Sequence, residues 1–518
     1  MVRLLPFGDR AVLAEAASVA EVLALHAALA ASRPDGVVDL VPAARTVLVG
    51  VDPRILPVAA ARAWIERAAG DTAGPAASTA AVVELPIRYD GEDLSELAAL
   101  LGVTAEEVAA RHAAADWTVA FTGFAPGFGY LVSEEWSFDV PRRSSPRTRV
   151  PAGAVGVAGE FTGAYPRQTP GGWQLIGTTT APLFDPAAET PVLLTPGTRV
   201  RFVPAPPTSA VARSAFAAPT SDGRARRDPT TGPAVRVVDP GLRATIQDQG
   251  RPGHAAEGVA VSGAADRAAL RTAQRLVGTA EQAAGVEITM GGFRAVALAD
   301  LWFAVTGAWG PIRLDGHPVD PYTAHPWPAG AELHVDWFEH GARGYLAVRG
   351  GWDVPRAVGS RSTDTLAGIG PAPLAAGDTL AVGADAVGAI PADGLHPWGA
   401  PADDVIEVAL APGPRSDWFR SDALPLLYES VWTVSGDADR VGIRLEGPAL
   451  VRSREGELPS EGMVPGAIQV PPAGRPVILG PDGPVTGGYP VVAVVDDASR
   501  DALAQARPGT RIRFRHAR

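Results

Sequence analysis

The chain has 518 residues, with 45 Lys plus Arg against 57 Asp plus Glu and a formal net charge of −12. Its 46% hydrophobic and 20% charged residues are typical of a folded globular protein and exclude wholesale disorder. One hydrophobic core does not serve a chain of this length, so we expect two to four domains. The absence of a basic run or an aromatic-basic stripe argues against nucleic-acid binding.

The sequence contains no cysteine, which excludes disulfides, cysteine-zinc sites and thiol catalysis. The nine His show no HExxH or HxH spacing and the acidic residues form no calcium-loop pattern, so no metal site is predicted. There is no N-terminal signal pattern and no run of 18 apolar residues. We therefore expect a cytoplasmic protein with no membrane association.

Residues 1–80 are predicted to form a small N-terminal α+β subdomain, with strands at 11–15, 37–40 and 46–51 and helices at 19–31 and 62–69. The small residues of 70–79 indicate a flexible joint. Residues 81–204 begin with a strand at 82–87, continue through helix-forming residues at 94–114 and end in a strand at 199–202. The Pro-rich and charged stretch 205–232 is predicted to be a linker.

Residues 233–518 form a second unit, with a predicted helix at 264–277 and an expected division into two lobes near 395–403. The 58 Gly and 49 Pro of the chain are scattered between short apolar runs, as in turn-rich β architecture.

Two stretches about 315 residues apart share three segments in the same order. The first has residues 150–157, 169–173 and 196–202, and the second has 464–470, 486–489 and 508–514. Each has a Val-Pro entry, then a Thr/Gly turn with an aromatic residue, then a terminal PGTR(V/I)RF strand. The repeat predicts two related β-rich lobes, with the working site where the two units face each other.

Three segments of the first unit carry candidate site residues. Phe121–Leu131 alternates Gly with aromatic residues, which indicates either a rigid exposed bend that displays rings or a tight turn in a barrel core. Arg142, Arg143, Arg147 and Arg149 lie between prolines and could bind a carboxylate or phosphate, or form a solvated basic loop. Thr169–Trp173 could expose backbone N–H groups to an anion or form a plain hairpin.

In the second unit, Gln247, Asp248, Arg251 and Asp266 form a dense polar set at the entry to a predicted helix that Ser262 could cap. Asp248 could act as a base or hold Arg251, and the residues leave both alternatives open. Arg349 and 359–363 repeat the combination of Gly with Arg and hydroxyl groups. With no Walker A, GxGxxG, nucleophile elbow or Ser-His-Asp order, the residues alone indicate a two-lobed, β-rich binder of an anionic ligand.

These motifs resemble a known pair of families. Residues 84–202 resemble the allophanate-hydrolase-type B subunit of bacterial ATP-dependent 5-oxoprolinase, through Gly123-Phe124-x-Pro126-Gly127-Phe128-x-Tyr130, Tyr165-Pro166 and Thr169-Pro170-Gly171-Gly172-Trp173. Residues 233–518 resemble the partner C subunit, through Thr245-Ile246-Gln247-Asp248-x-Gly250-Arg251, the 359–363 segment, 460–471 and Thr486-Gly487-Gly488-Tyr489-Pro490. The chain departs from the pattern at Gly129 and at 370–374, where an Arg that could hold an anion is replaced.

The resemblance implies a mainly β fold with some α, in which tandem cyclophilin-like β-barrels follow the small N-terminal α+β subdomain. It also implies a component of an ATP-dependent 5-oxoprolinase that uses ATP with Mg²⁺ and converts 5-oxoproline to glutamate with a separate lactam-utilisation subunit. One alternative is the carboxyltransferase part of a urea carboxylase, which takes CO₂ from carboxybiotin carried by another protein. A second is a non-catalytic regulator that binds a histidine kinase. The sequence has no biotinyl-lysine motif, which favours the oxoprolinase interpretation.

Asp248 and then His112 are the candidate catalytic residues. The candidate substrate- or nucleotide-binding residues are Phe124, Pro126, Gly127, Tyr130, Arg142, Arg147, Thr169, Gly171, Gly172, Gln247, Arg251, Ser262, Asp266, Arg349, Ser360, Ser362, Thr363, Gly487 and Gly488.

Overall fold

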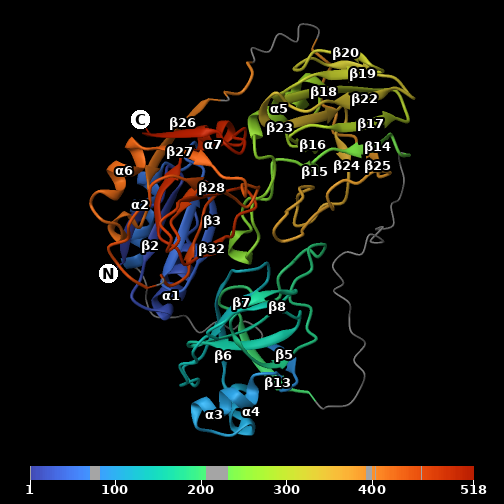
Figure 1. Ribbon diagram of the computed structural model, residues 1–518. Helices are drawn as coiled ribbons and strands as arrows, with labels where there is room; N and C mark the ends of the chain where they lie inside the picture. The colour runs from blue at the N-terminus through green and yellow to red at the C-terminus, as the bar shows by residue number, and fades with distance from the viewer. Residues whose placement is uncertain are drawn as a thin grey trace.

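The computed structural model describes residues 2–70, 82–205, 232–391, 399–402, 404–456 and 458–517. Nearly all of the predicted joint at 70–79 and of the predicted linker at 205–232, and much of the predicted division at 395–403, lie outside these residues. We name four parts of the chain the N-terminal unit (2–70), the first barrel (82–205), the central unit (232–391) and the C-terminal barrel (404–517). Figure 1 shows the N-terminal unit beside the C-terminal barrel, with the first barrel below them.

The N-terminal unit is one antiparallel sheet with two helices. Its strands pair in the order β1-β2-β4-β3, and its elements are β1 (Arg3–Pro6), β2 (Ala11–Glu15), α1 (Val19–Ala31), β3 (Val37–Pro42), β4 (Thr46–Val51) and α2 (Val58–Gly70). One face of the sheet packs on the helices through residues such as Val12 and Val49. The other face shares a core with the C-terminal barrel, where Phe7 and Leu48 meet Met463. The sheet is therefore covered on both faces, and the N-terminal unit is joined to the far end of the sequence.

The first barrel is a seven-stranded sheet in the order β12-β9-β10-β7-β6-β13-β5, and the backbones of Arg88 and Thr178 pair across its two ends. Its elements are β5 (Val83–Ile87), α3 (Leu94–Leu101), α4 (Ala105–Ala114), β6 (Trp117–Thr122), β7 (Gly129–Val132), β8 (Arg147–Val150), β9 (Ala154–Ala158), β10 (Phe161–Ala164), β11 (Thr169–Gly171), β12 (Gln174–Thr178) and β13 (Arg199–Pro204). The stretch 94–114 is two helices, because Gly102 takes a left-handed conformation at φ 70° and Thr104 caps a new helix.

The central unit packs two sheets around one core that contains Phe293, Trp327 and Trp352. The sheets run β20-β19-β22-β17-β14-β25-β24 and β15-β16-β23-β18-β21. Their elements are β14 (Val235–Pro240), β15 (Arg243–Gln247), η1 (Ala255–Glu257), α5 (Arg267–Leu276), β16 (Gly285–Thr289), β17 (Phe293–Ala297), β18 (Leu301–Trp309), β19 (Ile312–Leu314), β20 (His317–Pro318), β21 (His325–Trp327), β22 (Glu332–Val335), β23 (His340–Val348), β24 (Trp352–Asp353) and β25 (Thr379–Val382).

The C-terminal barrel is closed, in the order β26-β33-β30-β31-β28-β27-β34. Its elements are β26 (Val405–Pro412), η2 (Ser416–Trp418), α6 (Ala423–Glu429), β27 (Val431–Val434), β28 (Gly442–Glu446), β29 (Glu461–Gly462), β30 (Ala467–Gln469), β31 (Val477–Leu479), β32 (Thr486–Gly487), β33 (Val491–Val495), α7 (Asp497–Leu503) and β34 (Arg511–His516). Among the described residues, no helix is both long and apolar enough to cross a membrane.

The two barrels have the same construction at their ends, as the sequence repeat predicts. The terminal strands β13 and β34 each run parallel to the opening strand of their barrel, β5 or β26, and antiparallel to the next, β6 or β27. In both barrels a Trp indole on that next strand donates to a backbone oxygen of the preceding helix, Trp117 to His112 and Trp432 to Leu427, each at 3.0 Å. The predicted fold class, mainly β with tandem barrels, is confirmed.

Candidate functional site

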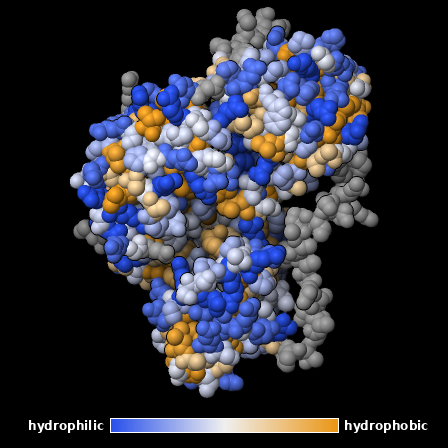
Figure 2. Space-filling model, viewed as in Figure 1, coloured by the Kyte–Doolittle hydropathy of each residue, from blue (hydrophilic) through white to orange (hydrophobic). Residues whose placement is uncertain are grey.

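A large cleft of the described residues lies where three units meet and has a volume of about 1930 Å³. Its walls come from α1 of the N-terminal unit, from β6, β7 and neighbouring loops of the first barrel, and from segments 458–460 and 486–489 of the C-terminal barrel. In Figure 2, apolar colour appears at the seam between the lower barrel and the rest of the molecule. The cleft is thus built from distant parts of the chain.

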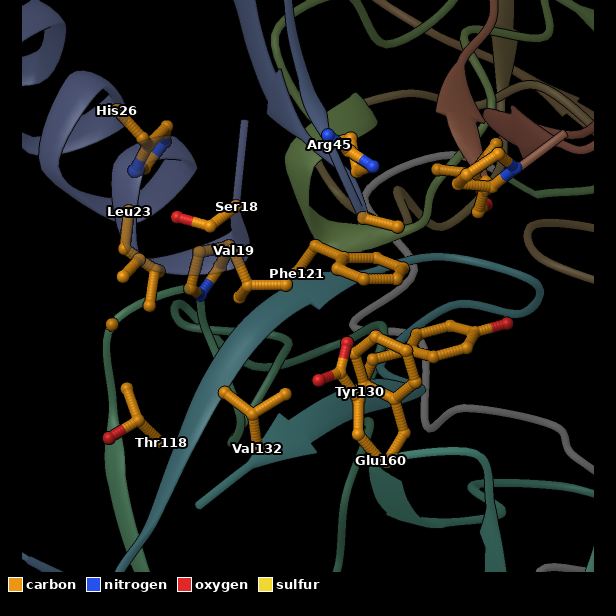
Figure 3. A pocket seen from close by; sticks show the side chains of 18 of the residues that line it. Ser18, Val19, Leu23, His26, Arg45, Thr118, Phe121, Tyr130, Val132 and Glu160 are labelled. Carbon is orange, nitrogen blue, oxygen red and sulfur yellow. The ribbon is translucent and has the colours of Figure 1, made fainter. Parts of the chain in front are cut away.

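One wall is the helix α1, which presents Val19 and Leu23 toward Thr118 and Val132 of the first barrel (Figure 3). Its start is fixed by a capping box in which the Glu21 N–H donates to Ser18 Oγ at 3.2 Å and the Ala17 N–H donates to Glu21 Oε2 at 3.1 Å. The helix contributes mainly apolar surface to the cleft, because the residues of α1 that line it are largely Ala, Val and Leu.

The other end of the cleft is aromatic. The rings of Phe121 and Tyr130 stack with centroids 4.3 Å apart, and Phe161 and Trp173 pack edge-on against Tyr130. Burial raises the pKa of Tyr130, although the nearby Arg142 charge opposes this, so its phenol stays neutral and able to donate. This end suits a small planar or apolar group with a polar edge.

Two exposed rings stand at the mouth of this aromatic end. Phe124 is 46% exposed and belongs to the first barrel, whereas Tyr489 is 41% exposed and belongs to the C-terminal barrel. Large exposed aromatic side chains at a cleft are typical of binding surfaces. A ligand between them would therefore contact both halves of the chain.

The charged residues of the cleft are mixed in sign. Arg45, Arg142 and Arg199 share it with Asp116, Glu134, Glu135 and Glu160. Arg199 is also paired with Asp116 at 3.3 Å. With more acidic than basic side chains, and with the acidic Glu21 in the first turn of α1, this lining does not fit the triphosphate of ATP. A single carboxylate near Arg142 is compatible with it.

The cleft brings together five of the predicted site residues, namely Phe124, Tyr130, Arg142, Gly487 and Gly488. Pro126 and Gly127 continue the turn after Phe124, and the Gly127 N–H donates to the Glu257 carbonyl of the central unit at 3.0 Å. Thr169 and Gly171 belong to β11, and Gly172 accepts a hydrogen bond from the Arg143 N–H at 2.9 Å, next to Trp173 at the cleft wall.

Arg147 does not line the cleft and is paired with carboxylates instead. Its Nη2 donates to Asp93 Oδ1 at 2.6 Å and to Glu92 Oε2 at 3.3 Å. Asp93 is almost fully buried and also accepts from Arg143 Nη1 at 2.7 Å and the Leu175 N–H at 2.7 Å. Burial disfavours the Asp93 carboxylate, but these partners outweigh it and lower its pKa.

A second group of predicted residues lies in a buried polar network of the central unit, at its contact with the C-terminal barrel. Asp248 is its hub and accepts from Ser360 Oγ at 2.7 Å, Ser362 Oγ at 2.5 Å, the Gly250 N–H at 2.8 Å and the Arg361 N–H at 2.7 Å. The other members donate from their side chains to backbone oxygens: Arg251 to that of Ser362, Gln247 to that of Thr363, and Thr363 to that of Pro371. The network therefore holds the loop 360–371 against β15.

The prediction that Ser262 caps the helix is wrong, because the helix α5 begins later. Asp266 is the cap and accepts from the Ala269 N–H at 2.9 Å. Ser262, with a left-handed φ of 50°, donates instead to Asp482 of the C-terminal barrel at 2.8 Å. Burial raises the pKa of Asp266 to about 6, although the Gln505 amide donates to it at 2.8 Å.

The structure places the last two predicted residues away from the cleft. His112 is fully buried in the first barrel, with Nδ1 at 2.9 Å from the Tyr89 hydroxyl and Nε2 at 2.9 Å from Thr162 Oγ1. Burial lowers the pKa of His112 to about 3, so the imidazole is neutral. Arg349 donates to the Val277 carbonyl at 3.0 Å.

Sequence reasoning missed the contribution of α1, Arg45 and Glu160 to the cleft. Their segments carry no polar motif, and the packing of residues 2–70 on the C-terminal barrel has no local signal. It also missed Arg440, whose guanidinium bonds Asp482 and Glu287. A lone Arg before an apolar strand gives no sign of burial. Tyr489 belongs to one of the motifs of the resemblance. An aromatic residue directly after Gly487-Gly488 is the feature that could have predicted its place in the cleft.

Two family models match the chain. Residues 2–194 match "Carboxyltransferase domain, subdomain C and D", and residues 257–516 match "Carboxyltransferase domain, subdomain A and B". Together the two matches cover the N-terminal unit, the first barrel except its last strand, most of the central unit and nearly all of the C-terminal barrel.

Among curated proteins, the C subunit of 5-oxoprolinase from Escherichia coli K12 is 38% identical over 285 residues, which are 54% of this chain and 90% of that protein. The B subunit of 5-oxoprolinase from Escherichia coli O157:H7 is 50% identical over 125 residues, 24% of this chain and 57% of that protein. Among solved structures, the crystal structure of TTHA0988 has a TM-score of 0.83 at 36% identity and covers 99% of this chain and 100% of that one. The counterparts of two separate proteins are thus joined in one polypeptide, and the predicted resemblance is confirmed.

Proposed function

The chain belongs to the carboxyltransferase-domain family, and from this premise we propose that it is a fused B-and-C component of a 5-oxoprolinase. In this proposal it converts 5-oxoproline to glutamate together with a separate lactam-utilisation subunit. One observation carries the proposal: the B-like barrel and the C-like C-terminal barrel line the same cleft. Clefts between domains are the usual place for a small-molecule site.

The residues of the cleft fit a lactam that carries a carboxylate. Arg142 offers a cation to the carboxylate, and Phe121, Tyr130 and Trp173 offer apolar walls to the ring. Exclusion of water by these walls strengthens the charged contact. Tyr130, held neutral by burial, can donate to the amide oxygen.

Since the lining does not fit a triphosphate, the proposal assigns ATP and its Mg²⁺ to the partner subunit. The volume supports a partner as well. Small-ligand pockets are usually about 300–1000 Å³, whereas this cleft has about 1930 Å³. The remaining space suits a segment of the lactam-utilisation subunit that closes over the substrate.

The catalytic roles predicted for Asp248 and His112 stay predictions, and the present proposal does not use them. Both side chains lie outside the cleft and have protein partners for their polar atoms. In the proposal they support the fold around the site, and the group that activates water comes from elsewhere.

The test is reconstitution. The purified chain is mixed with its candidate lactam-utilisation subunit, ATP, Mg²⁺ and 5-oxoproline, and glutamate is measured, with each component omitted in turn. Glutamate should form only in the complete mixture. Glutamate from this chain alone would contradict the dependence on a partner.

The family description favours one second candidate, carboxyl transfer from carboxybiotin on another protein. Avidin-sensitive incorporation of labelled bicarbonate into an amide, with no glutamate formed from 5-oxoproline, would select it. Tight binding to a histidine kinase without turnover of any of these substrates would select the regulator.

A further inference from the structure

The turn that carries Phe124 has an unusual backbone. Phe124 has φ 67°, a left-handed conformation that residues with a side chain seldom adopt. Its ring is also 46% exposed at the cleft. A strained residue of this kind persists only where its surroundings fix it. The contacts that fix it therefore matter for the site.

Two hydrogen bonds close the turn within the first barrel. The Gly123 N–H donates to the Phe128 carbonyl at 3.1 Å, and the Ala125 N–H donates to the Gly123 carbonyl at 2.7 Å. Two further N–H groups of the turn bond to other units. The Gly127 N–H donates to the Glu257 carbonyl at 3.0 Å, and the Phe124 N–H donates to Thr486 Oγ1 at 3.1 Å. The strained residue is thus held by a hydroxyl from the C-terminal barrel.

The approach of Thr486 requires the glycine before Phe124. A Cβ on Gly123 would lie 2.2 Å from Thr486 Oγ1 and 2.8 Å from its Cγ2, so any larger residue would push the hydroxyl away. Thr486 itself is only 6% exposed. Gly123 and Thr486 therefore form a close contact that only a glycine at position 123 allows.

Thr486 is held firmly on its own side. It lies on β32, which pairs with β29 so that Thr486 is opposite Gly462. The neighbouring Glu461 is paired with Arg415, whose Nη2 also bonds Glu15 of the N-terminal unit at 2.8 Å. Gly462 lies so close to Leu48 of the same unit that a Cβ on Gly462 would be 2.7 Å from the Leu48 Cβ. The support for Thr486 therefore reaches the unit that carries α1.

We propose that Thr486 is a positioning residue whose hydroxyl holds Phe124 in the left-handed conformation and so sets its ring at the mouth of the cleft. The C-like half of the chain thereby shapes the substrate wall of the B-like half. The proposal concerns the cleft itself, and only its kinetic measurement rests on the proposed function.

Hydrogen exchange in the full chain tests the proposal without any substrate. Thr486→Val keeps the shape but removes the acceptor, and Thr486→Ser keeps the acceptor. Exchange in the peptide 121–131 should become about three- to tenfold faster in Thr486→Val, the factor that loss of one hydrogen bond produces. Thr486→Ser should exchange like the unaltered protein, and the peptide 343–350 of the central unit should not change in either variant.

Unchanged exchange in Thr486→Val, or equal acceleration in both variants, would overturn the proposal. So would acceleration spread over the C-terminal barrel, since Thr486 would then only stabilise that barrel. Where the reconstituted reaction yields glutamate, kcat/KM should fall in Thr486→Val and recover in Thr486→Ser at equal Tm. A failed reconstitution would count against the proposed function and leave the exchange result standing.

Discussion

Arg440 and Glu287, 153 residues apart in the sequence, form an ion pair with 2.8 Å between Nη1 and Oε1 across the boundary of the C-terminal barrel and the central unit. The same guanidinium holds Asp482 through Nε and Nη2, both at 2.9 Å. All three side chains are almost completely buried. The two units that form the C-like half are therefore locked by a charged cluster.

Replacing Arg440 with Met should destabilise the protein strongly, because the buried Asp482 would lose its cation and the buried Glu287 would keep only its longer pair with Arg343, at 3.3 Å. The expected loss is about 3–5 kcal/mol, measured as a fall in Tm and in the denaturant midpoint. Arg511→Met is the matched control, since Arg511 pairs with the exposed Asp404, and it should cost less than about 1 kcal/mol. Equal effects of the two substitutions would contradict the buried cluster.

The free energy of unfolding should fall on mild acidification because of the buried His112. Burial lowers its pKa to about 3, whereas an unfolded His has a pKa near 6.5. Between these values the unfolded chain binds the extra proton, so stability present above about pH 6.5 is lost as the pH falls. From pH 6.5 to 5 the loss is about 2 kcal/mol.

Denaturant unfolding at pH 7 and pH 5 measures this loss. His112→Gln removes the titrating group and should flatten the difference, although it lowers the stability at pH 7. Replacement of the exposed His317 with Gln is the control for the substitution itself. A His112→Gln protein with the full acid loss would place the titrating group elsewhere.

Arg142 and Arg147 should separate into a binding role and a stabilising role. Because Arg142 lines the cleft, Arg142→Ala should weaken binding of 5-oxoproline by about 1–3 kcal/mol with little change in Tm. Arg147→Ala should lower Tm, since the buried Asp93 loses a partner, and should leave affinity nearly unchanged. Titration calorimetry and thermal unfolding distinguish the two, and an affinity loss in Arg147→Ala alone would reverse the assignment.

Asp248→Asn should lower Tm. The carboxylate accepts from four donors, which contact both of its oxygens. In Asn an NH₂ group replaces one of these oxygens, so a donor would face a donor there. The exposed Asp378, which accepts from the Ala375 N–H, provides the control Asp378→Asn. An unchanged Tm together with turnover reduced by about two to four orders of magnitude would instead make Asp248 a general base.

The sequence predicted the repeated barrel ending well, because its signal is local. The PGT turns and the alternating Arg and apolar residues of 199–202 and 511–514 specify a strand, and their shared order specifies related lobes. The bounds of α1 at Val19–Ala31 were also predictable, since Ser18, a residue that favours the cap position, lies directly before an apolar helix.

The site was only partly predictable, because its partners are distant in the sequence. Asp248 and Arg147 were singled out for their polar types, but Ser362 lies 114 residues from Asp248 and Asp93 lies 54 residues from Arg147. The local sequence around a residue does not predict that a partner so distant in the sequence will pair with it and bury it. The α1 wall was missed because the docking of Phe7 against Met463 depends on the complete fold.

The central claim is that one cleft, walled by both halves of the chain, receives the substrate. It is tested most directly by kcat/KM for 5-oxoproline in the reconstituted reaction, with Phe124→Ala from the B-like barrel, Tyr489→Ala from the C-like barrel and Trp337→Ala as control. Trp337 is 58% exposed on the central unit, outside the cleft. The account predicts that the first two substitutions each lower kcat/KM by about tenfold or more and that the third leaves it unchanged. A Tyr489→Ala protein as active as Trp337→Ala would contradict a site shared by the two halves.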